Sequence, residues 1–110
     1  MKKEIIEDLS KIKSHLGDNF NSFHLFGSSV KSLKNSRDID IMIRVKNKNN
    51  STEIIKNISG LNIPIGNISY NCYDGYKGKI TKYDFIVVSD KDIGDYFFSR
   101  NKSNFKMIVL

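Results

Sequence analysis

In the segment 38–45, β-branched apolar residues occupy every second position, and this alternation constrains the fold more than any other feature of the sequence. Every second position holds a branched apolar residue: Ile39, Ile41, Ile43 and Val45. Side chains of a β-strand point to opposite faces in turn, so these residues predict one face buried in a core. The other face begins with Asp38 and Asp40, whose α-carbons would lie roughly 6–7 Å apart along the strand.

The rest of the chain predicts helices and strands in irregular alternation. Apolar residues at helical spacing predict a helix over 3–16 that ends at Gly17. An apolar segment over 22–26 predicts a strand that ends in a tight turn at Gly27. Further helices are predicted over 30–34, between Asn50 and Gly60, and from Ser89 to Phe98. Segments 63–73 and 79–88 are predicted to pair as a β-hairpin about a turn at 74–78, and 106–110 is predicted to be a terminal strand. We therefore expect an α+β fold, a mixed sheet with helices on one face.

Length and composition limit the class of protein. We expect residues 1–110 to form a single domain, since 110 residues provide one modest core. No apolar run is long enough to cross a bilayer and no signal peptide is recognisable, so we expect a cytoplasmic protein without membrane contact. The net charge of +6 favours anionic partners such as nucleotides. The basic residues are scattered, so a nucleic-acid partner is possible but not favoured.

The two aspartates at 38 and 40 point to a divalent cation. Two carboxylates on the same face of a strand repel each other unless a cation lies between them. Magnesium takes one or two carboxylates together with substrate phosphates. An Asp-x-Asp pair can also be nothing more than a solvated strand edge, and the neighbouring residues favour the metal site over that alternative.

A turn at Gly27 and Ser28 and a later acid strengthen this interpretation. Glycine allows the backbone to approach an anion closely, and the Ser28 hydroxyl can donate a hydrogen bond to a phosphate oxygen. Asp84 lies inside an apolar segment, where a carboxylate requires a reason. Asp84 could pair with Lys82 at an exposed strand start, or it could lie beside Asp38 and Asp40.

Phe26-Gly27-Ser28, nine intervening residues and Asp38-Ile39-Asp40-Ile41 together resemble the signature of the polymerase-β-like nucleotidyltransferases. The chain length and the late Asp84 look most like the minimal nucleotidyltransferases, many of which are antitoxins encoded beside HEPN-type toxins. The resemblance extends over nearly the whole chain and implies the nucleotidyltransferase fold.

The resemblance also implies roles for individual residues. Asp38 and Asp40 would bind two Mg2+ ions, and Asp84 would act as a further metal ligand or as the general base. Gly27 and Ser28 would hold the triphosphate of ATP. Many minimal members have Arg-Gly shortly after the serine, where this chain has Lys31-Ser32. Lys31 can meet a phosphate as a point charge, but it lacks the two-pronged guanidinium.

From these features we expect transfer of AMP from ATP to a hydroxyl of a partner protein, a HEPN-type toxin. Two alternatives remain open. The chain could be an antitoxin that acts by contact without catalysis, or it could transfer a nucleotide to RNA or a small molecule. His24 and Cys72 are expected to have structural roles, because no second His or Cys stands at the spacing of a zinc site. Tyr70, Tyr73, Tyr76 and Tyr83 could offer a base-stacking surface, but we expect them to pack against the sheet or a partner.

Overall fold

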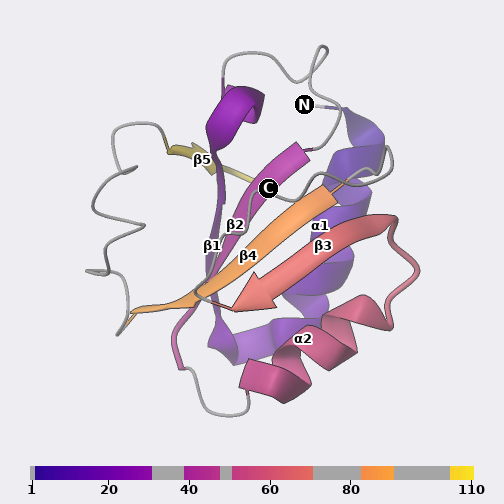
Figure 1. Cartoon of the computed structure of the whole chain (residues 1–110), viewed down its shortest axis with the longest axis vertical. Coiled ribbons are helices and arrows are strands. Elements are labelled where there is room, and N and C mark those ends of the chain that lie inside the picture. The colour runs from indigo at the N-terminus through magenta and orange to yellow at the C-terminus, as the bar shows by residue number, and fades with distance from the viewer. Residues whose placement is uncertain (1, 31–38, 48–50, 71–82, 91–104) are drawn as a thin grey trace.

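The computed structural model describes residues 2–30, 39–47, 51–70, 83–90 and 105–110 of the chain (Figure 1). Two α-helices, α1 and α2, and five strands, β1 to β5, lie within these ranges, together with the single-turn 3-10 helices η1 and η2. The bounds, in chain order, are α1 Lys3–Leu16, η1 Gly17–Asn19, β1 Phe20–Leu25, η2 Gly27–Val30, β2 Ile39–Val45, α2 Ser51–Ser59, β3 Ile65–Tyr70, β4 Tyr83–Ser89 and β5 Lys106–Ile108.

The helices form where the sequence predicts them. In α1 one apolar stripe is buried, and Gly17 ends the helix with a positive φ of 56° while its N–H donates to the carbonyl of Lys13. In α2 the buried residues are Ile54 and Ile58, one turn apart. Among the residues that the structure describes, neither helix is long and apolar enough to cross a membrane.

All five strands belong to one mixed sheet with the order β3-β4-β2-β1-β5. β1 pairs antiparallel with both β2 and β5, whereas β4 lies parallel to β2 on one side and to β3 on the other. Figure 1 shows β2, β3 and β4 starting at the same end of the sheet, with η2 beside the start of β2. Residues near the starts of β2 and β4 are therefore neighbours in space.

The predicted hairpin of 63–73 with 79–88 is wrong, because β3 and β4 are parallel. A parallel pair requires a connection of about a dozen residues or more, which the stretch 71–82 is long enough to provide. All seven residues of β4 are buried, as is usual for a strand in the middle of a parallel arrangement. The turn predicted at 74–78 lies outside the described residues.

The main core lies between the helices and one face of the sheet. Residues at alternate positions of β2 and β4 point toward α1 and α2: Ile39, Ile41, Ile43 and Val45 from β2, and Tyr83, Phe85 and Val87 from β4. They pack against apolar residues of both helices, so the two helices cover the same face. The predicted α+β architecture, a mixed sheet with helices on one face, is confirmed.

The opposite face of the sheet carries the other alternate positions. A smaller apolar cluster forms there from Phe26, Met42, Ile86 and Val88, with Phe105 packed against it. We call this the open face, since neither α1 nor α2 covers it. Asp40 precedes Met42 by two positions and Asp84 precedes Ile86 by two, so both acids belong to the open face.

Candidate active site

Asp40 and Asp84 stand directly opposite each other on the adjacent parallel strands β2 and β4. Strands so paired lie about 4.8 Å apart, and aligned residues point to the same face. Asp40 is 8% exposed and Asp84 is 4% exposed, although both are carboxylates. Acids are rarely buried to this extent, so an adjacent pair of them makes this position a candidate functional site.

Gly27 lies against Asp40. Its backbone has a positive φ of 61°, in the region that favours glycine. A Cβ at this position would lie 2.7 Å from Oδ2 of Asp40, closer than real Cβ atoms come to an oxygen. The residue before it, Phe26, donates its backbone N–H to the Asp40 carbonyl at 3.1 Å. The absence of a side chain at Gly27 therefore allows its backbone to pack directly against the Asp40 carboxylate.

Asn67 of β3 lies beside Asp84 and extends the row of Asp40 and Asp84 across the sheet, and it was not predicted from the sequence. It is aligned with Asp84 in the β3–β4 pair, and its Nδ2 donates to Oδ1 of Asp84 at 3.5 Å. The sequence feature that could have pointed to Asn67 was its polar side chain within a segment predicted to be extended. Strict alternation would nevertheless have placed Asn67 on the same face as Ile65, which packs toward the helices.

The remaining predicted site residues are only partly described. Ser28 follows Gly27 within η2, which begins the turn expected at this point. Asp38 and Lys31 lie outside the described residues, as do most of the helix predicted over 30–34 and of that predicted from Ser89 to Phe98. The structure thus brings together Gly27, Asp40 and Asp84 of the six predicted site residues.

The donor set at this position fits a hard divalent cation. Asp40 and Asp84 offer carboxylate oxygens from two adjacent strands, and magnesium prefers oxygen ligands. Gly27 packs directly against Oδ2 of Asp40, so its backbone lies beside one of these carboxylate oxygens. No cluster of three or more His, Cys, Asp and Glu side chains that could hold a metal occurs within the described ranges, to which Asp38 does not belong.

A second polar group lies at the other end of the open face. Arg44 forms an ion pair with Asp90 at 2.5 Å, and Asn21 donates to both oxygens of Asp90. Burial opposes ionisation of Asp90, but the hydrogen bonds from Arg44 and Asn21 keep its pKa below the usual value. Burial and the charge of Arg44 lower the pKa of His24, which shares a 2.8 Å hydrogen bond with Ser22. These contacts favour the structural role expected for His24.

On the helix side, Tyr83 links α1 to β4 immediately before Asp84. The buried Tyr83 hydroxyl donates to Oδ2 of Asp8 at 2.6 Å. Burial and this hydrogen bond raise the pKa of Tyr83 above its usual value, so the hydroxyl keeps its proton. Tyr70 also packs against the main core. The structural role expected for the tyrosines is confirmed for these two, whereas Tyr73 and Tyr76 lie outside the described residues.

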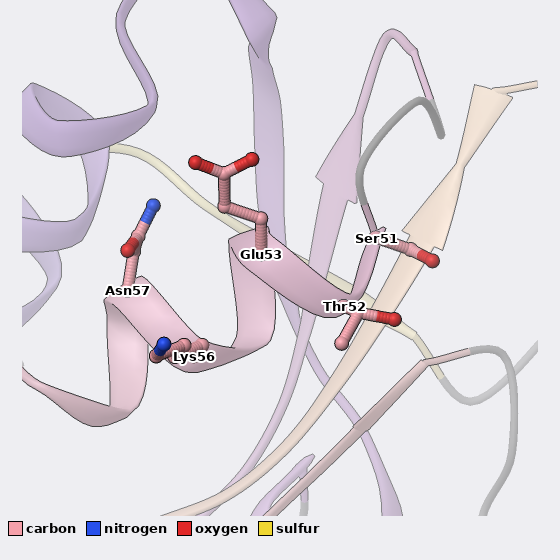
Figure 2. A pocket seen from close by; sticks show the side chains of 5 residues that line it. All are labelled: Ser51, Thr52, Glu53, Lys56 and Asn57. Atoms are coloured by element: carbon pink, nitrogen blue, oxygen red, sulfur yellow. The ribbon is translucent and has the colours of Figure 1, made fainter.

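A hollow along the start of α2 does not contribute to this site. It is lined by Ser51, Thr52, Glu53, Lys56 and Asn57, all of them from α2 itself. Figure 2 shows that their polar ends diverge: the hydroxyls of Ser51 and Thr52 point one way, and Glu53 and Asn57 point another. Since α2 packs on the helix side of the sheet, the hollow is separate from Asp40 and Asp84.

The chain was compared with protein families, curated proteins and solved structures. Neither a family model nor a curated protein matches it. Among solved structures it is similar to the spectinomycin adenyltransferase AAD(9) from Enterococcus faecialis, crystallised with ATP and spectinomycin. The TM-score is 0.51 at 22% sequence identity, over 87% of this chain and 37% of that protein.

The likeness to this adenyltransferase concerns the fold. The chain spans a little over a third of that enzyme (37%), and the identity of 22% is too low to carry activity across. The mixed five-stranded sheet and this structural neighbour agree with the polymerase-β-like nucleotidyltransferase fold. The fold expected from the glycine turn and the aspartates is thereby confirmed.

Proposed function

We propose that this chain is a magnesium-dependent nucleotidyltransferase that transfers AMP from ATP to a hydroxyl group. The observation that carries the proposal is the pair of buried carboxylates, Asp40 and Asp84, aligned on adjacent strands beside a glycine that cannot be replaced without a clash. The nucleotidyltransferase fold supports it, and the similar adenyltransferase was crystallised with ATP.

In the proposed reaction, the oxygen of an acceptor hydroxyl attacks the α-phosphorus of ATP. The new P–O bond forms as the bond from the α-phosphorus to the bridging oxygen breaks, and pyrophosphate leaves. Asp84 either accepts the hydroxyl proton or serves as a metal ligand. Most of the rate acceleration would come from positioning and electrostatics, because little covalent chemistry remains for the protein.

The residues around the carboxylates have separate roles in this proposal. Asp40, Asp84 and Asp38 would hold magnesium, which when bound supplies positive charge to the phosphates and acidifies a nearby oxygen. Gly27 and Ser28 would face the triphosphate with their backbone, and the Ser28 hydroxyl and Lys31 would meet phosphate oxygens. Burial of Asp40 and Asp84 strengthens the electrostatic interactions that these residues make.

For the acceptor we propose a hydroxyl of a partner protein, a HEPN-type toxin that is silenced by the modification. This assignment rests on the resemblance to the minimal nucleotidyltransferases that Phe26-Gly27-Ser28, Asp38-Ile39-Asp40-Ile41 and Asp84 carry. A small-molecule hydroxyl is the second candidate, since the similar solved enzyme is a spectinomycin adenyltransferase.

A labelling experiment distinguishes the acceptors. The chain is incubated with ATP labelled at the α-phosphate, Mg2+, and either the protein encoded by the adjacent gene, spectinomycin or RNA. We expect the label to appear on the protein. Label on spectinomycin or RNA alone overturns the protein acceptor but keeps the transferase, whereas no label on any acceptor contradicts the proposed activity.

A second experiment, which measures neutralisation of the partner by variants of the chain, tests the alternative that the chain acts by contact without catalysis. Asp40→Asn and Asp84→Asn each remove a charge with little change in size, so binding to a partner protein would survive them. If these variants still neutralise the partner as well as the unmodified chain does, the chain is a contact inhibitor. We expect them to lose neutralisation together with the transfer of label.

A further inference from the structure

We propose that Asn67 is a positioning residue that holds the Asp84 carboxylate in place for cation binding. This inference rests on the proposed function, because it assigns Asn67 a part in the same site. It is carried by two observations that are independent of each other: a register shift in β3, and a hydrogen bond across to β4.

The register shift turns Asn67 onto the open face. Ile65 is aligned with Tyr83 and Asn67 with Asp84, so β3 advances by two residues where β4 advances by one. Ile65 packs toward the helices, and an unshifted strand would have sent Asn67 to that same side. Beyond the shift, Ile68 again packs toward the helices, although it is three residues from Ile65. Bulges of this kind re-aim side chains, often beside active sites.

The hydrogen bond specifies what Asn67 does there. Its Nδ2 donates to Oδ1 of Asp84 at 3.5 Å. An amide donor adds no charge, so it orients the carboxylate while leaving the negative charge available to a cation. Asn67 is half-buried, whereas Asp84 is 4% exposed. Groups that orient metal-binding side chains typically contribute 10–100-fold to metal affinity.

Asn67, Asp84 and Asp40 therefore form one row across the sheet, on the successive strands β3, β4 and β2. Within it, Asn67 has no carboxylate of its own and acts through Asp84. If Asn67 acts only through Asp84, replacing Asn67 should have little effect once Asp84 has been replaced. If Asn67 instead stabilises β3 in general, replacing it should have the same effect with or without Asp84.

The test measures binding of Mn2+–ATP by calorimetry to the whole chain. We expect Asn67→Leu, which keeps the size of the side chain and removes the donor, to weaken binding by roughly tenfold. Asn67→Ala serves as the second variant should the leucine disturb folding, and Asn67→Gln, which retains an amide donor, should restore part of the affinity. The matched control is Asn21→Leu, which removes an amide–carboxylate contact at the other end of the open face.

The decisive comparison repeats Asn67→Leu in a chain that already carries Asp84→Asn and measures the free energy of unfolding, because that chain is itself expected to lose the binding of Mn2+–ATP. Support requires that Asn67→Leu causes little further loss of stability there, while Asn21→Leu alone binds Mn2+–ATP like the parent chain. An equal loss in both backgrounds, or no loss in either, overturns the positioning role. The proposed function fails separately, namely if the unmodified chain does not bind Mn2+–ATP or if Asp40→Asn and Asp84→Asn bind it as tightly as the unmodified chain does.

Discussion

Gly27 and Asp40 are packed so closely that no side chain fits between them: a Cβ on Gly27 would lie 2.7 Å from Oδ2 of the aspartate. The contact joins the turn at the end of β1 to the acid at the start of β2. It makes a glycine with a positive φ of 61° a determinant of the carboxylate position.

Gly27→Ala should therefore damage the site as well as the backbone. We expect a stability loss of about 1–3 kcal/mol from the positive φ, and in addition a loss of stabilisation by Mg2+–ATP, because the methyl group displaces Asp40. Gly17→Ala is the matched control, since Gly17 has a φ of 56° but open space around its Cβ position. Thermal unfolding with and without Mg2+–ATP measures both effects. Equal ligand responses in the two variants would refute the role of the contact.

Tyr83→Phe removes the hydrogen bond that links β4 to Asp8 of α1. We expect a loss of about 1–3 kcal/mol in the free energy of unfolding, because the buried Asp8 carboxylate loses a donor. Urea unfolding measures this loss, and Tyr70→Phe, on the same side of the sheet, serves as the comparison. A loss no larger than that of Tyr70→Phe would show that the hydrogen bond contributes little.

The same hydroxyl predicts a pH dependence of stability. The folded state raises the pKa of Tyr83 above its usual value, whereas an unfolded tyrosine loses its proton near pH 10. The contribution is thus fully present below about pH 10 and is lost as the pH rises above that value. Unfolding free energies measured from pH 8 to 11 should fall more steeply for the unmodified chain than for Tyr83→Phe. Parallel curves would contradict the raised pKa.

Arg44→Met should raise the pKa of His24. Burial is the larger cause of the lowered pKa and remains in the variant, so we expect a partial return toward the usual value. Arg44→Lys keeps the positive charge and should leave the pKa of His24 nearly unchanged. An NMR titration of the imidazole protons, assigned with His15→Gln, provides the measurement. If Arg44→Met and Arg44→Lys titrate alike, the charge of residue 44 has no influence on His24.

The sequence predicted those parts of the fold that local patterns encode. The alternation in 38–45 located β2 to within a residue, and helical spacing with Gly17 located α1. Whether a neighbouring strand runs parallel or antiparallel depends on the path of the chain through space, and the turn-forming residues at 74–78 wrongly favoured a hairpin. The unbroken apolar run Phe85–Val88 was the available sign of a central parallel strand.

The site was predictable to the extent that it follows regular alternation. The alternation in β2 assigned Asp40 to the face opposite the isoleucines. The segment around Asp84 is apolar on both faces, so its position beside Asp40 was expected from the family resemblance, and the register of β2 with β4 aligns the two acids. Asn67 could not be found in this way. Its direction depends on a register shift next to Gly66, and such a shift reverses the face of every residue that follows it.

The central claim is that the aligned carboxylates bind a metal–nucleotide complex, and a thermal-shift titration tests it most directly. The unmodified chain is heated with ATP in the presence of Mg2+ and again with a chelator, beside Asp40→Asn and Asp84→Asn. We expect ATP at a hundredfold its Kd to stabilise the unmodified chain by about 2.7 kcal/mol, only when Mg2+ is present, and both variants to lose this response. Stabilisation that is independent of Mg2+, or as large in both variants as in the unmodified chain, would contradict metal–nucleotide binding at these carboxylates.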